Sequence, residues 1–445
     1  MSKTFSELGL SQIVIKSLAD CNIITPTEIQ EKVIPEILTT SNDVVGLAKT
    51  GTGKTAAFGL PLLEQIKIDH NVIQGVILAP TRELGQQIFN TISDFAKYIP
   101  ELSITLACGG VPIKPQIERL SLSTHIVVAT PGRLIDLIQR DAVSLKHVSH
   151  LVLDEADEML SALKDGLDKI VAAIPKQRRT YLFSATMPGA IKQLIQNYMS
   201  KHITQVSADV STTGNVSVDH KYVVVEPIEK LNVLMHFLSS QDGKQGIIFC
   251  KTKAAVNKLA KNLAINRFSS GALHGSLSQG IRDRIMGQFR DHHISILVAT
   301  DLAARGIDIK DLAYVVNYHL PDTYEAYVHR SGRTARAGAS GLALSVIQDD
   351  ELQDIPDFED ELQIQFTELD KPDDNAVAEN NTVLWAKKIF KTKPNRELSP
   401  ELKNRVKTVF HHLTKDELIE KLLANYVNNT KPSEKLTEVK KTKKR

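Results

Sequence analysis

The sequence predicts an α/β fold: two parallel-sheet domains in tandem, followed by a small helical extension with a basic tail. Short apolar runs alternate with helical patterns along most of the 445 residues, as is typical of parallel sheets covered by helices. The two halves of the chain also repeat strand-like segments in the same order. Beyond Gly341 these segments give way to amphipathic helical patterns, so we expect two similar α/β domains and a different C-terminal unit.

Two pairs of segments carry the internal repeat. Residues 75–80 are similar to residues 246–251, and residues 125–130 are similar to residues 294–300. Each segment has the pattern of a strand that ends in polar or basic residues. Short β-rich stretches match easily, but both pairs occur in the same order, which favours a duplicated α/β domain.

The composition narrows the class of protein. A hydrophobic fraction of 42% supports ordinary packed cores, and Cys21, Cys108 and Cys250 lie too far apart to indicate a disulfide framework or a zinc site. The N-terminus lacks the apolar core of a signal peptide, and no apolar run reaches membrane-spanning length. We therefore expect a soluble, cytoplasmic protein.

A glycine-rich turn lies between a strand-like run that ends at Val44-Val45 and a helical pattern that opens at Ala56. Its residues are Ala48, Lys49, Thr50, Gly51, Thr52, Gly53, Lys54 and Thr55. Backbone N–H groups in such a turn form an anion nest, and the helix N-terminus adds a positive dipole. We predict that Lys54 reaches the β- and γ-phosphates of a nucleotide and that Thr55 holds Mg²⁺. The alternative is a strand–helix turn with a surface lysine.

A second acidic element completes this predicted site. Asp154-Glu155-Ala156-Asp157 follows the buried-type strand 151–153, and open α/β sheets bind ligands at the carboxyl ends of their strands. We predict that Asp154 helps to hold Mg²⁺ through water and that Glu155 orients and deprotonates the water that attacks the γ-phosphate. The alternative is an acidic helix N-terminus, where carboxylates are favoured in any case.

The sequence at 154–157 spells the name of the DEAD-box RNA helicase family, and the chain resembles that family, in its bacterial form, over nearly the full motif series from Phe5 to Gly338. The resemblance implies two RecA-like domains, ATP and Mg²⁺ as cofactors, and RNA as partner. It also implies an ATP-dependent RNA helicase that unwinds short duplexes locally as its two domains close. At the level of the family, ribosome assembly or RNA turnover is the expected setting.

The segment that ends at Gln30 resembles the adenine-reading Q motif of the family. The resemblance implies that Gln30 reads the adenine edge, that Thr27 supports the phosphate loop, and that Phe5 is the isolated upstream aromatic residue. The sequence departs from the family at Asn22 and Ile23, where Gly and an aromatic residue are usual. Ile23 is therefore expected to cover the adenine face without aromatic stacking.

Several segments that follow strand patterns resemble the RNA-facing motifs of the family, which usually has Ala at Gly85. The residues implied at the RNA are Arg82, Gly110, Thr130 and Arg133 in the first half and Thr252, Gly275, Arg282 and Thr300 in the second. Contacts of this kind hold the phosphate backbone without reading the bases. We therefore expect RNA binding that does not depend on sequence.

The remaining motifs resemble those that complete catalysis and couple it to RNA. Gly306 and Asp308 are implied at the nucleotide ribose and phosphates, and Arg333 and Arg336 as arginine fingers on the transferring phosphoryl group. Coupling between hydrolysis and strand separation is implied for Ser184, Thr186, Asp157 and His329. Arg330, Arg333 and Arg336 recur every third residue, so anions are expected nearby, although no acidic residue interleaves with them.

Three functions are open at this point: an ATP-dependent RNA helicase, an RNA clamp with slow hydrolysis, and a processive DNA translocase of the same superfamily. The presence of Glu155, Arg333 and Arg336 favours the helicase over the clamp. The DEAD spelling and the Q-like motif favour it over the translocase.

The C-terminal end has its own patterns. We predict a late helix of the second domain in 349–361, a loose segment at 370–381, and a helical hairpin that begins at Ser399-Pro400-Glu401 and has a capping box at 414–417. The predicted units are 1–206 for the first domain, 207–219 for the linker, 220–370 for the second domain, 371–430 for the helical extension and 431–445 for a disordered tail.

The uneven distribution of net charge along the sequence predicts a function for the C-terminal end. The formal net charge is +2, but residues 383–445 contribute about +10, which leaves about −8 for the rest of the chain. An acidic surface does not attract a polyanion from a distance. We predict that the basic end tethers RNA, with the hairpin holding the tail near the cleft; a tail that only aids solubility is the alternative.

Overall fold

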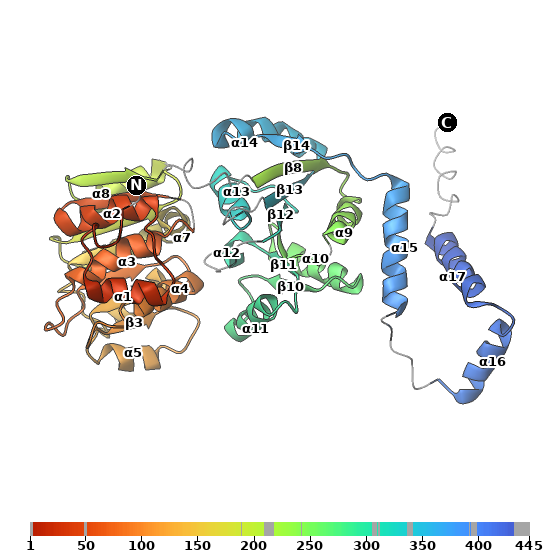
Figure 1. Cartoon of the computed structure of the whole chain (residues 1–445), viewed down its shortest axis with the longest axis horizontal. Helices are drawn as coiled ribbons and strands as arrows, with labels where there is room; N and C mark the ends of the chain where they lie inside the picture. Colours follow the sequence, from red (N-terminus) through yellow and green to blue (C-terminus); the bar gives the residue numbers. More distant parts are fainter. Residues whose placement is uncertain are drawn as a thin grey trace, which may run out of the picture.

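The computed structural model of the chain contains two α/β domains and a helical C-terminal extension (Figure 1). The residues that it describes are 3–48, 51–187, 189–208, 218–241, 243–304, 309, 312–335, 341–390, 392 and 398–430. No helix within these ranges is both long and apolar enough to cross a lipid bilayer.

Within its described residues, domain 1 is built on a seven-stranded parallel sheet with the strand order β3-β4-β2-β5-β6-β1-β7. The strands are β1 (Asp43–Leu47), β2 (Gly75–Leu78), β3 (Ile104–Ala107), β4 (Ile126–Ala129), β5 (His150–Leu153), β6 (Arg179–Ser184) and β7 (Ile203–Ser207). The helices are α1 (Gln12–Asp20), α2 (Glu28–Thr39), α3 (Lys54–Gln65), α4 (Arg82–Phe95), α5 (Lys114–Leu120), α6 (Pro131–Gln139), α7 (Ala156–Ala173) and α8 (Gly189–Tyr198).

Helices cover both faces of this sheet, which explains why its strands read as continuous apolar runs. Val44 and Val45 are neighbours in β1, yet Val44 packs into the core on one face and Val45 into the core on the other. Val152 and Leu153 of β5 divide in the same way. All seven strands are parallel, so their carboxyl ends lie at one edge of the sheet, where the predicted site residues follow β1, β2, β4 and β5.

Domain 2 repeats this topology, with the strand order β10-β11-β9-β12-β13-β8-β14 over the part of it that is described. The strands are β8 (Val218–Val224), β9 (Gly246–Phe249), β10 (Ser270–Leu273), β11 (Ile296–Ala299), β12 (Tyr314–Asn317), β13 (Gly341–Ile347) and β14 (Phe366–Glu368). The helices are α9 (Lys230–Ser240), α10 (Lys253–Ile265), α11 (Gln279–Arg290), α12 (Asp301–Ala304), α13 (Tyr324–Ser331), the 3₁₀ helix η1 (Asp349–Asp354) and α14 (Ile355–Leu362).

The strand orders confirm the duplicated α/β domain. The repeated segments fall on β2 and β9, each third in its sheet, and on β4 and β11, each second. The late helix predicted in 349–361 is present as η1 and α14. Most of the predicted linker, residues 209–217, lies outside the described residues, while β7 reaches Ser207 and β8 begins at Val218, so strands occupy both ends of the predicted range.

The C-terminal extension consists of α15 (Asp374–Phe390), α16 (Pro400–Phe410) and α17 (Lys415–Thr430) in the described part of the chain. The prediction of a loose segment at 370–381 is wrong, because α15 begins at Asp374. Its polar first turns gave no helical signal, and α15 is instead held by tertiary contact: Leu384 is buried in the core of domain 2 beside α9.

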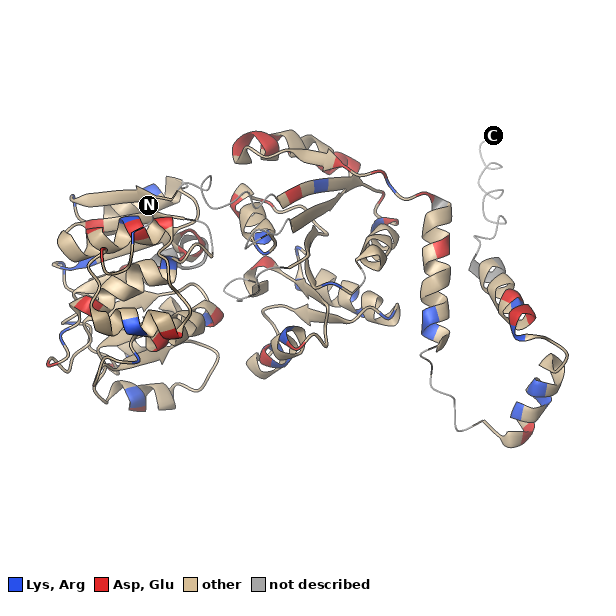
Figure 2. Ribbon diagram, in the orientation of Figure 1, with Lys and Arg blue, Asp and Glu red and all other residues tan. Residues whose placement is uncertain are grey.

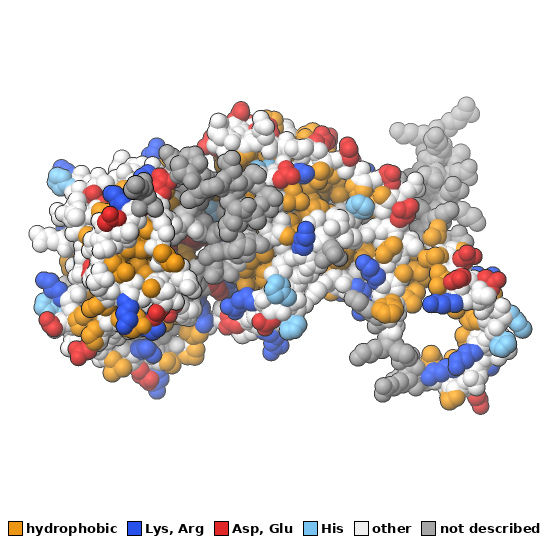
Figure 3. Space-filling view, viewed as in Figure 1, with side chains coloured by type: hydrophobic (Ala, Val, Ile, Leu, Met, Phe, Trp, Pro, Cys, Tyr) orange, Lys and Arg blue, Asp and Glu red, His pale blue; other side chains and the backbone are white. Residues whose placement is uncertain are grey.

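The two helices predicted for the hairpin are present as α16 and α17, but the prediction that they pack on each other is wrong. Ser399 Oγ accepts a hydrogen bond from Leu402 N at 3.2 Å, and the capping box at Thr414 is formed. However, α17 packs on α15 through the stacked rings of Trp385 and Tyr426, whose centroids lie 4.6 Å apart. The apolar face of α16 stays exposed, at Leu402, Val406, Val409 and Phe410. Orange side chains are accordingly visible over the C-terminal helices in Figure 3.

The extension lies on the side of domain 2 that faces away from domain 1 (Figure 1). Basic residues mark α16 and the end of α15, while acidic residues gather on η1 and α14 (Figure 2). The tail itself, 431–445, is outside the described residues. The expectation that the hairpin holds this tail near the cleft is therefore not tested and stays a prediction, although α17 itself lies on the side of domain 2 that faces away from domain 1 (Figure 1).

Candidate active site between the two domains

The glycine-rich turn joins β1 to α3, as predicted. Gly51 and Gly53 have φ angles of 86° and 90°, in the left-handed region that glycine adopts most readily. Lys54 is the first residue of α3, and its Nζ is buried without a hydrogen-bond partner among the described residues. A buried, unpaired ammonium is costly, so this arrangement fits a bound anion. Thr55 follows in the first turn of the helix, and Thr50 lies outside the described residues.

The Q-like segment is bonded directly to this turn. Thr27 Oγ1 donates to the carbonyl of Thr52 at 2.8 Å, and Gln30 Nε2 donates to the carbonyl of Gly53 at 3.1 Å. Gln30 Oε1 accepts from the backbone N–H of Thr27 at 3.0 Å, which caps α2. Thr27 thus contacts the phosphate loop where it was expected to support it. The amide of Gln30 is turned to the loop in this structure, so its reading of adenine stays a prediction.

The structure accommodates the two residues at which the Q-like segment departs from the family pattern, Asn22 and Ile23. Asn22 has a φ of 57°, a left-handed conformation that glycine favours and asparagine tolerates. Ile23 is half-buried against the core of domain 1, and Phe5 is buried within that core. Ile23 therefore keeps an apolar role at this position.

The acidic element begins at the carboxyl end of β5, where Asp154 and Glu155 are both buried. Glu155 has φ 50° and ψ 53°, a strained conformation for a residue with a side chain, and its Oε2 has no hydrogen-bond partner in the described chain. Burial raises the pKa of Asp154, against the effect of Lys54. Burial, together with Glu158 and Asp154, raises the pKa of Glu155 to about 7, a value suited to a general base.

Thr55 and Asp154 are the residues that we predict to hold Mg²⁺. The described residues contain no group of three or more His, Cys, Asp or Glu side chains that could hold a metal ion. Mg²⁺ is usually held by one or two carboxylates together with substrate phosphates and water. The buried carboxylate of Asp154 near the phosphate loop fits an ion that binds together with a nucleotide.

The four predicted coupling residues lie together across the domain boundary. Thr186 Oγ1 donates to Asp157 Oδ2 at 3.0 Å, and Ser184 Oγ donates to the carbonyl of Thr186 at 2.7 Å. From domain 2, His329 Nε2 lies 3.6 Å from the same Asp157 Oδ2, while its Nδ1 lies 2.7 Å from Glu158 Oε1. The sequence reading missed Glu158, which directly follows the DEAD residues.

These contacts fix the charges at the boundary. Burial alone would lower the pKa of His329, but the two carboxylates raise it to about 10. Burial alone would raise the pKa of Asp157, but His329, Lys54 and the Thr186 hydroxyl hold it well below its usual range. His329 is therefore a protonated imidazolium between two carboxylates at neutral pH.

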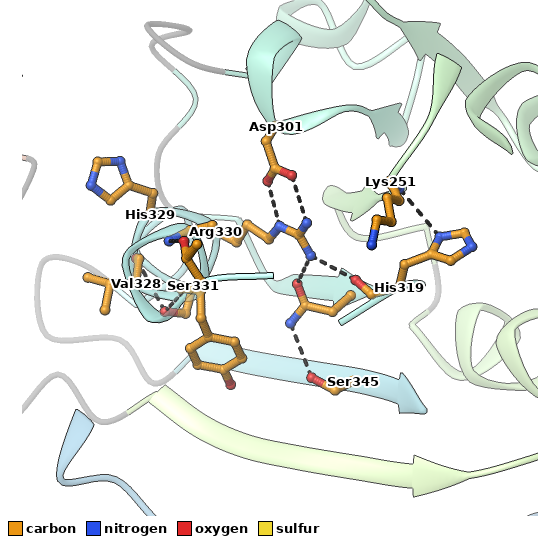
Figure 4. Close-up of polar contacts among 12 residues, drawn as sticks. Lys251, Asp301, His319, Val328, His329, Arg330, Ser331 and Ser345 are labelled. Atoms are coloured by element: carbon orange, nitrogen blue, oxygen red, sulfur yellow. Dashed lines mark hydrogen bonds and ion pairs between the residues drawn. The ribbon is translucent and has the colours of Figure 1, made fainter. Parts of the chain in front are cut away.

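The arginines of domain 2 divide into two roles. Arg333 is buried and lines a cavity of about 190 Å³ that Asp157 and Glu158 of domain 1 also line. Arg330 forms a double ion pair with Asp301, with Nε–Oδ1 and Nη2–Oδ2 distances of 2.6 and 2.7 Å (Figure 4). The anion expected near these arginines is thus Asp301, from a distant segment. Arg336, Gly306 and Asp308 are outside the described residues.

The predicted RNA-facing residues of domain 1 cluster at the carboxyl ends of β2, β3 and β4. A side chain at Gly110, whose φ is 81°, would meet Arg82 Nη1 at 3.3 Å. Thr130 Oγ1 accepts from the N–H of Gly109 at 3.2 Å. Arg133 donates to Gln116 Oε1 and to the carbonyl of Val111, at 2.7 and 2.8 Å, so its guanidinium is held in place by α5 and the loop that precedes it.

In domain 2, Arg282 donates to the carbonyl of Ala303 at 3.2 Å and reaches across the boundary to Glu83 Oε1 at 3.1 Å. Gln279 Nε2 donates to the same Glu83 oxygen at 3.3 Å. The sequence reading gave Glu83 no role, although it is the one acidic residue in the segment 80–84. This second bridge joins the two domains next to the residues that we predict to face RNA.

The other predicted RNA-facing residues of domain 2 follow strand ends. Thr252 caps α10 by accepting from Ala255 N at 3.1 Å. Gly275 follows β10 in open space, and Thr300 connects β11 to α12. They therefore lie at the same edge of the second sheet.

The glycine at position 85 is explained by its neighbour. A Cβ at Gly85 would lie 2.8 Å from Cys108 Sγ, closer than packing allows. Cys108 is fully buried, and burial raises the pKa of its thiol to about 11. The alanine usual at this position in the family does not fit beside a cysteine at 108.

Three segments of the chain match known protein families. Residues 27–194 match the family described as DEAD/DEAH box helicase, residues 229–338 match the helicase conserved C-terminal domain, and residues 377–433 match a helical domain described as that of a probable ATP-dependent RNA helicase.

Relatives of known name cover most of the chain. The ATP-dependent RNA helicase CshA of Limosilactobacillus reuteri is 40% identical over 83% of this chain and 74% of its own length. The DEAD-box ATP-dependent RNA helicase CshA of Geobacillus kaustophilus is 36% identical over 89% of this chain and 84% of its own.

Two solved structures share the arrangement of the domains. S. cerevisiae Dbp5 bound to RNA and ADP BeF3 is 28% identical, with a TM-score of 0.76 over 86% of this chain and 100% of that chain. Mss116p bound to ssRNA and AMP-PNP is 26% identical, with a TM-score of 0.76 over 88% of this chain and 85% of that chain.

Proposed function

The chain belongs to the DEAD/DEAH box helicase family, and from this premise we propose that it is an ATP-dependent RNA helicase that unwinds short duplexes locally. One observation carries the proposal. Asp157 and Glu158 of domain 1, which directly follow Asp154 and Glu155, line one cavity together with His329 and Arg333 of domain 2. Neither domain holds both the phosphate loop and the arginines.

Within domain 1, the residues prepare a nucleotide for hydrolysis. Lys54 and the N–H groups of the glycine turn bind the β- and γ-phosphates, and Thr55 and Asp154 hold Mg²⁺. Mg²⁺, when bound, neutralises charge on the phosphate oxygens. Glu155 accepts a proton from the attacking water, which its raised pKa near 7 permits at neutral pH.

Domain 2 completes the chemistry by approaching domain 1. Arg333, and by the family resemblance Arg336, stabilises the charge on the transferring phosphoryl group. RNA contacts come from both domains, including Arg82 and Arg133 on one side and Arg282 on the other. ATP and RNA therefore favour the same closed arrangement, and each ligand strengthens the binding of the other.

The RNA contacts go to the phosphate backbone, so the substrate class is structured or duplex RNA without a required sequence. The cytoplasm is the proposed location, on the ground that the N-terminal residues lack the apolar core of a signal peptide. Ribosome assembly or RNA turnover is the proposed setting, and it rests only on the family resemblance.

The test is ATP turnover measured without nucleic acid, with RNA, and with DNA of the same length. We expect RNA to stimulate turnover and DNA to have little effect. Equal stimulation by DNA favours a translocase, and RNA binding without stimulated turnover favours a clamp.

A further inference from the structure

His329 of domain 2 lies between two neighbouring carboxylates of α7. Its Nδ1 is 2.7 Å from Glu158 Oε1, whereas its Nε2 is 3.6 Å from Asp157 Oδ2. That Asp157 oxygen also accepts the hydroxyl of Thr186 at 3.0 Å, so Asp157 divides its charge between two partners. The shorter contact across the boundary is therefore the one made by Glu158.

The burial of Glu158 indicates that this carboxylate does more than stabilise the N-terminus of its own helix, α7. An acidic residue in the first turn of a helix is ordinarily stabilised by the helix dipole while it stays in water. The side chain of Glu158 is only 4% exposed, and that of His329 is 14% exposed. A buried carboxylate needs a close partner of opposite charge, and the imidazolium of the other domain provides one.

The contact is placed where it can orient the catalytic arginine. Glu158 N donates to the carbonyl of Glu155 at 3.0 Å, so Glu158 is fixed relative to the proposed base. His329 lies in the last turn of α13, four residues before Arg333, and Glu158 and Arg333 line the same cavity. Holding His329 thus holds the segment that presents Arg333 to domain 1.

We propose that Glu158 is a positioning residue of the ATPase: its carboxylate fixes His329, and through it the Arg333 segment, against domain 1 in the closed state. The proposal rests on the function proposed above. It adds a contact partner for His329 beyond the DEAD residues themselves.

The experiment is a double-mutant cycle in the full-length chain, with Glu158→Gln, His329→Gln and the two combined. Glu118→Gln, on the exposed surface of α5, is the charge-matched control. The measurements are kcat, KM for ATP and the RNA concentration for half-maximal stimulation. Interdomain energy transfer between dyes on the two domains, with AMP-PNP and RNA, reports closure independently of hydrolysis.

We expect Glu158→Gln to raise the RNA concentration for half-maximal stimulation about tenfold and to reduce closure, as the loss of a charged hydrogen bond predicts. In the His329→Gln background, Glu158→Gln should raise the RNA concentration for half-maximal stimulation by less than about twofold, because the partner of Glu158 is already absent. The Glu118→Gln control should match the parent.

Two results would overturn the proposal. One is that Glu158→Gln closes its domains as fully as the parent; the other is that it raises the RNA concentration for half-maximal stimulation equally with and without His329. Should Glu158→Gln unfold, Glu158→Asp, which keeps the charge but shortens the side chain, provides the same cycle. The closure measurement separates this proposal from the function: a parent that closes but is not stimulated by RNA contradicts the proposed helicase, and the variants still decide the role of Glu158.

Discussion

The two domains share a topology but differ at equivalent positions, and the difference locates the chemistry. In domain 1, β1 leads through the glycine turn to Lys54 at the start of α3; in domain 2, the equivalent β8 leads to Lys230 at the start of α9. Lys54 Nζ has no hydrogen-bond partner in the described chain. Lys230 Nζ donates to the carbonyl of Tyr318 at 3.2 Å and lies 3.6 Å from Glu351.

The strand that carries the acidic residues differs in the same way. Strand register aligns β5 with β12, so Asp154 and Glu155 correspond to Tyr318 and His319. In domain 2 the ammonium of Lys230 therefore binds groups of its own domain. In domain 1 the ammonium of Lys54 makes no hydrogen bond to the described residues, which fits a ligand at that position. The fold is the same in both domains, so our proposal of a nucleotide site in domain 1 rests on a buried lysine that makes no hydrogen bond to the described residues and on the buried carboxylates of Asp154 and Glu155.

Among changes within domain 1, the largest effect is expected from Glu155→Gln. This change removes the proposed base and leaves the phosphate loop intact, so turnover should fall by about 10²–10⁴ while ATP and RNA still bind. Steady-state turnover and equilibrium binding check both parts. Turnover within a few-fold of the parent would remove Glu155 from the mechanism.

The equivalent lysines provide a matched pair. Lys54→Ala should weaken ATP binding and lower turnover at least about 100-fold, with little loss of stability, because the Lys54 ammonium makes no hydrogen bond to the described residues. Lys230→Ala should instead lower the free energy of unfolding by about 1–3 kcal/mol and keep turnover within a few-fold. Denaturant unfolding and ATPase assays on both variants measure this difference between the domains. Similar changes in stability and turnover in the two variants would contradict it.

The domain boundary should make the cooperation of ATP and RNA depend on pH. The pKa of His329 rises from 6.5 to about 10 when the two carboxylates contact it, so protonation stabilises closure. This stabilisation is complete below about pH 6.5, declines as pH rises, and is lost above about pH 10. RNA should therefore lower the KM for ATP less at pH 8.5 than at pH 6.5, and His329→Gln should flatten this dependence.

The smallest effect concerns packing in domain 1. Gly85→Ala forces Cβ against Cys108 and should cost about 1–3 kcal/mol of unfolding free energy, most of it recovered when Cys108→Ala is added. Gly287→Ala, in α11 with open space around it, is the control and should be neutral or slightly stabilising. An uncorrected loss in the double variant would mean that another contact, not Cys108, determines the glycine.

Local patterns allowed much of this molecule to be predicted from sequence. The glycine turn, the acidic strand end and the repeated strands depend on near neighbours, and all lie where they were expected. The bridges between Glu83 and Arg282 and between Arg330 and Asp301 join distant segments, so spacing in the sequence gave no sign of them. The prediction of a loose segment at 370–381 failed for a related reason. The helix α15 is stabilised by burying Leu384 in domain 2, and its own sequence pattern gives little sign of this contact.

The central claim is that hydrolysis requires residues of both domains in one site. The most direct test is single-turnover hydrolysis by Arg333→Ala in the full-length chain, with ATP and RNA saturating. ATP should still bind, because Lys54 and the phosphate loop are intact, but the hydrolysis rate should fall by about 10³ or more, as for the loss of an arginine finger. A rate within a few-fold of the parent would contradict the shared site and leave domain 1 as the sole seat of the chemistry.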